Sequence, residues 1–250
     1  MTTVPGSVVA IFPQAVELHE FLDQTGDVLA ARGFHPGEAL AVTAGCRDEI
    51  AAEYRAEIRR RWDQSFDFAS LSGLPFAGVT GMRAVFDHVP HVAGHPEVVI
   101  FAMPHIGVLA DGTMGRAMRR GRSRPTTACG SLLTAIQAAR GVQPTPPPEC
   151  SDRPLIDPLD PEQSLVQFRL AAQFGDISTM SPVDLVRGVA ELMVTELWQL
   201  LAAVTIPGED DVALVGGILI HGPDGNDYVS PYARLIRSDG VLTDERFDDA

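Results

Sequence analysis

The stretch AVTAGCRDEI, residues 41–50, decides the fold and raises the functional question. It opens as an apolar run, passes through a turn of small residues and then sets Cys46, Arg47, Asp48 and Glu49 where a helix begins. A continuous apolar run is typical of a strand that is covered on both faces. The stretch therefore predicts a buried strand and a tight turn, followed by a helix that begins beside a thiol and a carboxylate.

Strands and helices alternate beyond this stretch. A second apolar run, residues 98–102, ends at Pro104 and His105, and a turn around Cys129 opens into a helical pattern. Helices are predicted over residues 16–32, 48–62, 131–140, 162–174 and 182–204. We therefore predict an α/β fold with a central mixed, mainly parallel sheet flanked by helices. VALVGGILI and YVSPYARLIR, joined by HGPDGND, predict a C-terminal hairpin at the sheet edge.

We expect one domain over residues 1–250, because the sequence shows no internal repeat and no clear linker. Residues 72–81, SGLPFAGVTG, are interpreted as a glycine-rich loop. Residues 142–161 hold seven prolines and predict a long loop. Loops of that length usually cover a site or extend onto a neighbouring subunit.

The charge balance excludes several classes of partner. The formal net charge is −14, so the chain repels phosphate backbones and anionic lipid heads, and we expect neither nucleic-acid nor membrane partners. The apolar run 185–204 contains Arg187, Glu191 and Glu196, which favours a core helix over a membrane span. The opening MTTVPGSVVAIFP lacks the features of a signal peptide, so we expect a cytoplasmic protein with reduced thiols.

Three potential metal ligands share one local design. Cys46 and His105 each follow a predicted strand, and Cys129 lies just ahead of a helix. Sites in α/β sheets gather at the carboxyl ends of strands, and a helix N-terminus stabilises a thiolate. Two thiolates and one imidazole form a zinc ligand set that leaves a fourth position for water. The pattern therefore predicts a catalytic zinc site.

Each of these residues also has a structural alternative. A buried cysteine often serves as a small apolar filler, and His105 can be satisfied by backbone carbonyls. The candidates lie 59 and 24 positions apart, without a short metal-binding spacing. Asp48 can cap its helix, point toward whatever Cys46 binds, or do both. An arginine partner would keep Asp48 ionised and oriented.

The motifs as a group resemble those of β-type carbonic anhydrases, and most closely the limiting-CO₂-inducible B/C family. The matching segments are AGCRDE (44–49), GLPFAGVTG (73–81), HVP (88–90), MPHIG (103–107), CGSL (129–132) and ALVGGI (213–218). The common β family instead carries its histidine and second cysteine three residues apart. It also has an arginine where this chain has Ile50.

The resemblance implies site residues position by position. Cys46, His105 and Cys129 would ligate Zn²⁺, and Asp48 would belong to a catalytic carboxylate–arginine pair. Arg83, downstream of the glycine-rich segment, is the expected partner, with Arg47 and Arg55 as alternatives. His88 in the HVP segment would line the pocket or pass protons, or else be a structural histidine.

The activity implied is reversible hydration of carbon dioxide to bicarbonate by a zinc-bound hydroxide. Leu74, Phe76 and Val79 are candidates for the apolar pocket that carbon dioxide needs. The resemblance also implies a homodimer or higher homo-oligomer. Two other functions stay open: a zinc-binding homologue with little hydratase activity that acts as a partner or regulatory protein, and a hydrolase with Cys129 as nucleophile and His105 as base.

Overall fold

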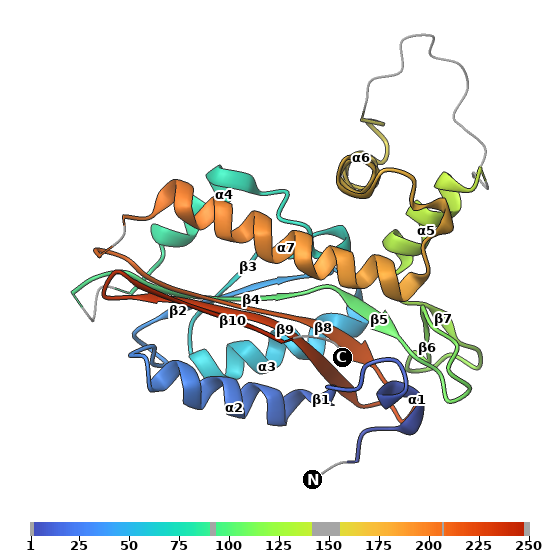
Figure 1. The fold of residues 1–250 in the computed structure, drawn as a ribbon, viewed down its shortest axis with the longest axis horizontal. Coiled ribbons are helices and arrows are strands. Elements are labelled where there is room, and N and C mark those ends of the chain that lie inside the picture. Colours follow the sequence, from blue (N-terminus) through green and yellow to red (C-terminus); the bar gives the residue numbers. More distant parts are fainter. Residues whose placement is uncertain (1–2, 91–93, 142–155, 207, 248–250) are drawn as a thin grey trace.

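The computed structural model describes residues 3–90, 94–141, 156–206 and 208–247. Its centre is a mixed sheet with strand order β1-β9-β8-β4-β2-β3, in which β10 also pairs with β9 and β5 with β8 (Figure 1). The neighbours β3, β2, β4, β5 and β8 are parallel, whereas β9 pairs antiparallel with β8, β10 and β1. The predicted mixed, mainly parallel sheet is confirmed. Its strands are β1 (Val16–Glu17), β2 (Leu40–Gly45), β3 (Ser65–Asp67), β4 (Glu97–Met103), β5 (His105–Gly107), β8 (Asp211–His221), β9 (Asp227–Ser238) and β10 (Val241–Arg246).

Helices cover both faces of this sheet. Figure 1 shows α4 (Gly78–Phe86) and α7 (Pro182–Val204) on one face, with α2 (Leu18–Ala30) and α3 (Ala52–Trp62) on the other. At one end of the sheet lie α5 (Gly130–Ala139), α6 (Pro161–Phe174) and the small ribbon of β6 (Arg116–Ala117) and β7 (Thr126–Thr127). The remaining helices are short: α1 (Gly6–Val9), η1 (Glu49–Ala51), η2 (Leu71–Gly73) and η3 (Ile177–Thr179). The prediction of a sheet flanked by helices is therefore confirmed.

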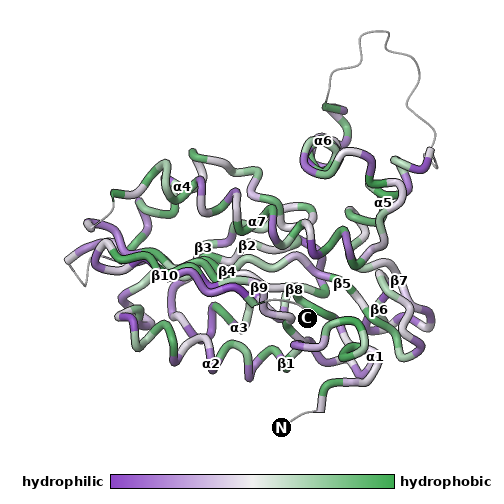
Figure 2. The backbone as a smooth tube through the Cα atoms, in the orientation of Figure 1, coloured by the Kyte–Doolittle hydropathy of each residue, from purple (hydrophilic) through white to green (hydrophobic). Residues whose placement is uncertain are grey.

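The apolar runs are continuous because the central strands feed two cores. All residues of β2 and β4 are buried, and their alternate side chains enter the cluster under α7 or the cluster under α2 and α3. Figure 2 shows the resulting apolar colour along the inner strands. Fully burying one such side chain stabilises the fold by about 1.5–3 kcal/mol. None of the described helices combines the length and apolar character that a membrane span needs.

The C-terminal hairpin is present, and it continues further than the sequence predicts. Strand β8 lies inside the sheet, between β9 and β4, and the outer edge of β9 is itself paired with β10 and β1. Residues 142–155 of the predicted loop 142–161 lie outside the described residues, and the third cysteine of the sequence, Cys150, is among them.

The glycine-rich segment departs from its interpretation as a loop. Residues from Gly78 onward form α4, which packs against the same face of the sheet as α7. A Cβ on Gly81 would come within 2.9 Å of Cζ of Phe68. This glycine permits close packing of a helix and does not mark a turn, so the prediction of a loop over residues 78–81 is wrong.

Candidate metal centre

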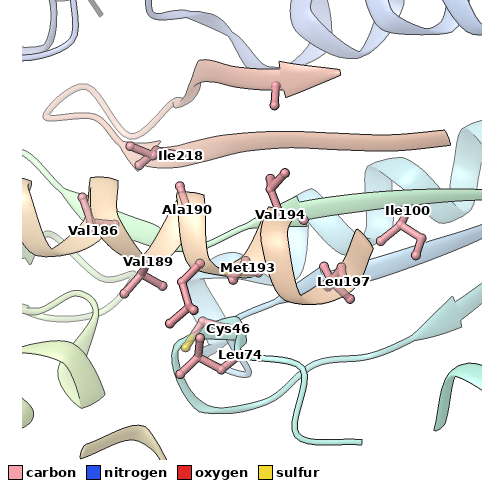
Figure 3. Close-up of a cluster of buried hydrophobic side chains, with 14 of the residues drawn as sticks. Cys46, Leu74, Ile100, Val186, Val189, Ala190, Met193, Val194, Leu197 and Ile218 are labelled. Carbon is pink, nitrogen blue, oxygen red and sulfur yellow. The ribbon is translucent and has the colours of Figure 1, made fainter. Parts of the chain in front are cut away.

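The carboxyl ends of β2 and β4 bring Cys46 and His105 to the same place. The two strands pair in parallel up to Gly45 opposite Met103, and each candidate follows within two residues. Cys46 is 2% exposed and His105 1% exposed. Figure 3 shows Cys46 at the border of the apolar cluster that α7 covers. The expectation that strand ends gather these residues is therefore met.

Cys129 joins this pair as the residue before α5. It is the N-cap of that helix, and its Sγ lies 3.6 Å from Sγ of Cys46. The two sulfurs and one ring nitrogen of His105 all lie within 4.8 Å of one another. In the part of the chain that the structure describes, no other group of three histidine, cysteine or acidic side chains is arranged in this way. We call Cys46, His105 and Cys129 the Cys–His–Cys cluster.

The His105 ring has one bonded and one open nitrogen. Its Nδ1 lies 2.9 Å from Nε2 of His221, whose own Nδ1 lies 2.7 Å from Oδ1 of Asp227. Its buried Nε2 has no hydrogen-bond partner among the described residues. Burial lowers the pKa of His221, so this imidazole is favoured in its neutral form. A buried ring nitrogen without a hydrogen-bond partner lowers the stability of the fold unless a ligand or an ion binds to it.

The two thiols share their protons unequally. The hydrogen bond with Cys129 lowers the pKa of Cys46 to about 4, with further help from His105 against the effect of burial. The same sulfur contact, together with burial, raises the pKa of Cys129. The pair therefore favours one thiolate beside one thiol. Bound metal displaces such protons, so the cluster fits a thiolate-binding divalent ion.

Asp48 stands beside the cluster and caps the helix that follows. Its Oδ1 accepts a hydrogen bond of 3.3 Å from the backbone N–H of Ile50 at the start of η1. Its Oδ2 lies 3.8 Å from Nε2 of His105. The capping role expected for Asp48 is thus observed, and the other carboxylate oxygen faces the cluster.

Arg119 is the partner of Asp48. Its Nη1 donates to Oδ1 of Asp48 at 2.6 Å and its Nη2 to Oδ2 at 2.9 Å, and it also contacts Glu49. Two parallel bonds of this kind are the strongest geometry for a carboxylate and a guanidinium. Burial acts to raise the pKa of Asp48, but the hydrogen bonds from Arg119 outweigh it and hold that pKa below its usual value.

The predicted partner of Asp48 is therefore corrected. Arg83 is exposed on α4, and Asp48 is paired with Arg119 instead. The alternatives fail as well, because Arg47 binds Glu162 of α6 and Arg55 donates to the carbonyl of Cys46. The sequence signal that points to Arg119 is the arginine-rich segment 116–124, which lies between His105 and Cys129.

A close backbone contact between β5 and the β6–β7 ribbon positions Arg119 next to Asp48. The β6–β7 ribbon lies against β5, with hydrogen bonds from Gly115 N to Gly107 O (2.8 Å) and from Gly107 N to Ala128 O (3.0 Å). A Cβ on Gly107 would lie 2.3 Å from the carbonyl oxygen of Arg116, so only glycine fits there. The guanidinium of Arg119 is then fixed by Thr126 Oγ1 at 2.6 Å and Thr127 O at 2.8 Å.

His88 makes the contacts of a structural histidine. Its Nδ1 lies 2.6 Å from the carbonyl of Ala84 one turn earlier, and its ring stands edge-on to Phe66. The side chain is exposed at the end of α4. None of these contacts joins it to the cluster, and a role in proton passage stays a prediction.

The apolar cavity beside the cluster is formed by other residues than expected. It has room for about one water molecule and borders His105 and Cys129. Its apolar wall comes from α5 and α7, chiefly Leu132, Ile136, Leu185 and Val186. Leu74, Phe76 and Val79 are not among the residues that line it.

The geometry agrees with what this chain resembles among known proteins. The family model of limiting CO₂-inducible proteins B/C beta carbonic anhydrases matches residues 15–238. The chain belongs to this family. The crystal structure of PtLCIB4, a homologue of the limiting CO₂-inducible protein LCIB, matches with a TM-score of 0.81 and 27% identity, covering 97% of this chain and 99% of that one.

A second solved member extends the likeness. The crystal structure of the limiting CO₂-inducible protein LCIB matches with a TM-score of 0.75 and 25% identity, covering 98% of this chain and 99% of that one. No curated protein matches the chain at a significant level. The fold and the family are therefore established over nearly the whole length, and the chemistry of this member rests on its own residues.

Proposed function

We propose that this protein is a zinc-dependent carbonic anhydrase that catalyses the reversible hydration of carbon dioxide to bicarbonate. The observation that carries the proposal is the Cys–His–Cys cluster, whose ligand atoms lie within 4.8 Å of one another beside a buried, unpartnered Nε2. Two thiolates and one imidazole suit zinc in tetrahedral geometry and leave its fourth position free. Membership of the family supports carbon dioxide as the substrate.

Different residues of the site would have different roles in the reaction. Zinc held by Cys46, His105 and Cys129 would supply a Lewis acid that makes water a nucleophile near neutral pH. Asp48 would accept a hydrogen bond from the nucleophile and fix which lone pair faces the substrate. Arg119 would keep Asp48 ionised and hold its two oxygens in place, as their paired hydrogen bonds allow.

The apolar cavity supports carbon dioxide as the reactant. Leu132 and Ile136 of α5 and Leu185 and Val186 of α7 border it on the side of the cluster formed by His105 and Cys129. A small, uncharged and linear molecule needs no polar recognition, so an apolar wall next to the nucleophile is sufficient.

A second function is favoured by one distance. Oδ2 of Asp48 lies only 3.8 Å from Nε2 of His105, so a small rotation would let this carboxylate take the fourth ligand position. The site would then bind zinc without activating water, and the protein would act as a partner or regulatory member of its family. Metal content would be the same in both cases, and the rate of hydration separates them.

We also propose that the chain acts as a single domain that assembles into a homodimer or a higher homo-oligomer. Large apolar side chains are exposed next to and on α6, with Leu159 85% and Phe168 54% accessible. Burial of such side chains between copies would be favourable. Light scattering coupled to size exclusion would measure the assembly.

The decisive experiment combines zinc analysis with stopped-flow hydration of carbon dioxide. Cys46→Ala, His105→Ala and Cys129→Ala should each leave less than about 0.1 zinc per chain and no rate above background, because each removes one of three protein ligands. The exposed His35→Ala is a matched control and should keep both zinc and rate. Zinc retained at full occupancy in all three cluster variants would rule the site out.

Chelation and alkylation distinguish the remaining alternative. A chelator should abolish hydration and added zinc should restore it. A hydrolase with Cys129 as nucleophile would ignore the chelator and lose activity on treatment with iodoacetamide. A wild-type protein that holds one zinc per chain but does not accelerate hydration would establish the partner or regulatory function instead.

A further inference from the structure

His105 is held from behind by a second buried histidine and a carboxylate. Nδ1 of His105 lies 2.9 Å from Nε2 of His221, and Nδ1 of His221 lies 2.7 Å from Oδ1 of Asp227. The first two residues are 1% and 6% exposed, and Asp227 is more accessible, with 16% of its side chain exposed. The three side chains form a hydrogen-bonded line from the cluster toward the surface, which we call the histidine–aspartate chain.

The backbone of three adjacent strands fixes this line. Strand β5 pairs with β8 so that His105 faces Leu219 and Gly107 faces His221, which makes the two histidines diagonal neighbours. Strand β8 pairs with β9 so that His221 faces Asp227 directly. Cross-strand neighbours at such positions are within reach of each other without any loop rearrangement. The histidine–aspartate chain is therefore built from side chains of paired strands of the sheet.

The order of donors and acceptors in this line follows from its last member. An ionised carboxylate only accepts, so His221 must donate from Nδ1. A neutral imidazole has one N–H, which leaves Nε2 of His221 as an acceptor. Nδ1 of His105 must then donate to it, and Nε2 of His105 is left without a proton.

The opposite order is unfavourable. A proton on both nitrogens of His221 would turn Nδ1 of His105 into the acceptor and place the N–H of His105 on Nε2. That N–H would be buried and would form no hydrogen bond as the side chains stand, because Oδ2 of Asp48, at 3.8 Å, is beyond hydrogen-bond distance. Leaving a buried donor unpaired costs about 1–3 kcal/mol. It would also occupy the nitrogen lone pair that a metal requires.

We propose that His221 and Asp227 are positioning residues which set the tautomer of His105, so that its bare Nε2 is presented to Cys46 and Cys129. The inference deepens the proposed function, because a bare Nε2 is the form of His105 that can bind zinc. Partners behind a metal-binding histidine typically change metal affinity or activity by about 10–100-fold when they are removed. Here the carboxylate acts through a second imidazole instead of contacting the ligand itself.

The tautomer can be measured directly in the metal-free protein. Nitrogen-15 NMR of histidine-labelled wild-type protein, with His105 assigned from the spectrum of His105→Gln, should show His105 protonated on Nδ1 and bare on Nε2. In His221→Leu, which keeps the bulk but removes the acceptor, the His105 signals should shift to a mixture of tautomers or to the Nε2–H form. Wild-type His105 with its proton on Nε2 would overturn the proposal without any variant.

Zinc affinity gives the second readout. Competition with a chromophoric chelator should show affinity reduced about 10–100-fold in His221→Leu. The decrease should be smaller in Asp227→Asn, which can still accept a hydrogen bond but has lost its charge. His221→Gln should recover most of the affinity, because its amide oxygen can accept from His105 while its NH₂ donates to Asp227. A structural role for bulk alone would be rescued by Leu and not by Gln.

A matched control separates this effect from general disturbance. His19 borders the same surface pocket as His221 and Asp227 but pairs with Glu57, so His19→Leu should leave tautomer and affinity unchanged. Unchanged affinity and tautomer in His221→Leu would refute the inference. If wild-type protein binds no zinc, the proposed function fails, while the NMR measurement still decides the tautomer of His105. Tautomer and function can thus fail separately.

Discussion

A carboxylate lies near each end of the parallel strands, at their carboxyl ends and at their amino ends, and the fold shifts the two pKa values in opposite directions. At the carboxyl edge, Asp48 receives two hydrogen bonds from Arg119 and its pKa lies below the usual range. At the amino edge, Glu97 opens β4 opposite Asp211 on β8, and His95 lies 3.6 and 3.3 Å from their oxygens. Burial raises the pKa of Glu97, and its Oε2 has no hydrogen-bond partner among the described residues.

The comparison shows what decides the charge of a buried carboxylate in this molecule. Burial acts in the same direction on Asp48 and Glu97, because it raises the pKa of both. Only Asp48 has a guanidinium in bidentate contact, and that contact reverses the outcome. The ionised state of Asp48 is therefore a property of the β6–β7 ribbon that delivers Arg119, and the sheet edge alone does not produce it.

Replacing Arg119 should leave Asp48, like Glu97, a partly buried carboxylate without a guanidinium partner. Arg119→Ala should keep zinc but reduce hydration by about 10²–10³-fold, since both the charge and the orientation of Asp48 are lost. Arg119→Lys should recover only part of the rate, because an ammonium cannot form the paired contact. Stopped-flow rates at equal zinc content measure the effect.

The neighbouring Arg120 provides the control. It is exposed and differs from Arg119 by one position, so Arg120→Ala should retain the wild-type rate. Equal losses in the two variants would mean that the net charge of the ribbon matters and that the contact with Asp48 does not.

Replacing Asp48 should lower the free energy of unfolding by an intermediate amount. The pKa of Asp48 is lower in the folded state than its unfolded value of about 3.9, so its contribution is fully present above that pH and declines as the pH falls toward the folded pKa. Asp48→Asn should lower the free energy of unfolding of the metal-free protein by about 1–3 kcal/mol at pH 7. The difference from wild type should narrow below pH of about 4, as urea titrations would show.

Glu49→Gln is the appropriate comparison for this variant. Glu49 contacts the same guanidinium but its side chain is 72% exposed, so its loss should cost less than about 1 kcal/mol. A larger cost for Glu49→Gln than for Asp48→Asn would contradict the importance given to the buried contact.

The smallest change in the free energy of unfolding is expected on replacing Glu97, at the amino ends of the strands, and this change is a stabilisation. The folded pKa of Glu97 is raised, so stability falls as the pH rises from the unfolded value of about 4.3 through the folded one. Glu97→Gln removes this penalty and should raise the free energy of unfolding by up to about 1 kcal/mol at pH 8. The gain should vanish near pH 4, again by urea titration.

Asp211→Asn tests whether the gain is specific to Glu97. Asp211 accepts hydrogen bonds from Ser238 Oγ at 2.9 Å and from the N–H of Asp239 at 3.0 Å, so its replacement should destabilise the protein. A stabilisation by both variants would indicate simple relief of negative charge in this acidic chain.

The comparison also shows which parts of the site the sequence predicts. The sequence predicts that Cys46 and His105 meet, because apolar runs mark parallel strands and the carboxyl ends of such strands share one edge. The residues that give this signal lie close to each motif in the chain. The sheet, the helices 162–174 and 182–204 and the position of Cys129 before a helix were predictable for the same reason.

The residues that hydrogen-bond to Asp48 and His105 could not be predicted in this way. Asp48 and Arg119 lie 71 positions apart, and His105 and His221 lie 116 apart, so no local pattern connects them. The position of Arg83 after the glycine-rich segment is misleading, because that segment leads into α4, where Arg83 is exposed. Strand register places His221 against Asp227, and register is not visible in one sequence.

The close fit of the β6–β7 ribbon against Gly107 has one more consequence. The ribbon lies between His105 and Cys129 in the chain, so an ion bound by these two residues would close the intervening segment into a ring. Closing a loop reduces the conformational freedom of the residues within it, and Arg119 is one of these residues. Occupancy of the centre would thereby steady the guanidinium that keeps Asp48 charged, so the ion would help to assemble its own catalytic surroundings.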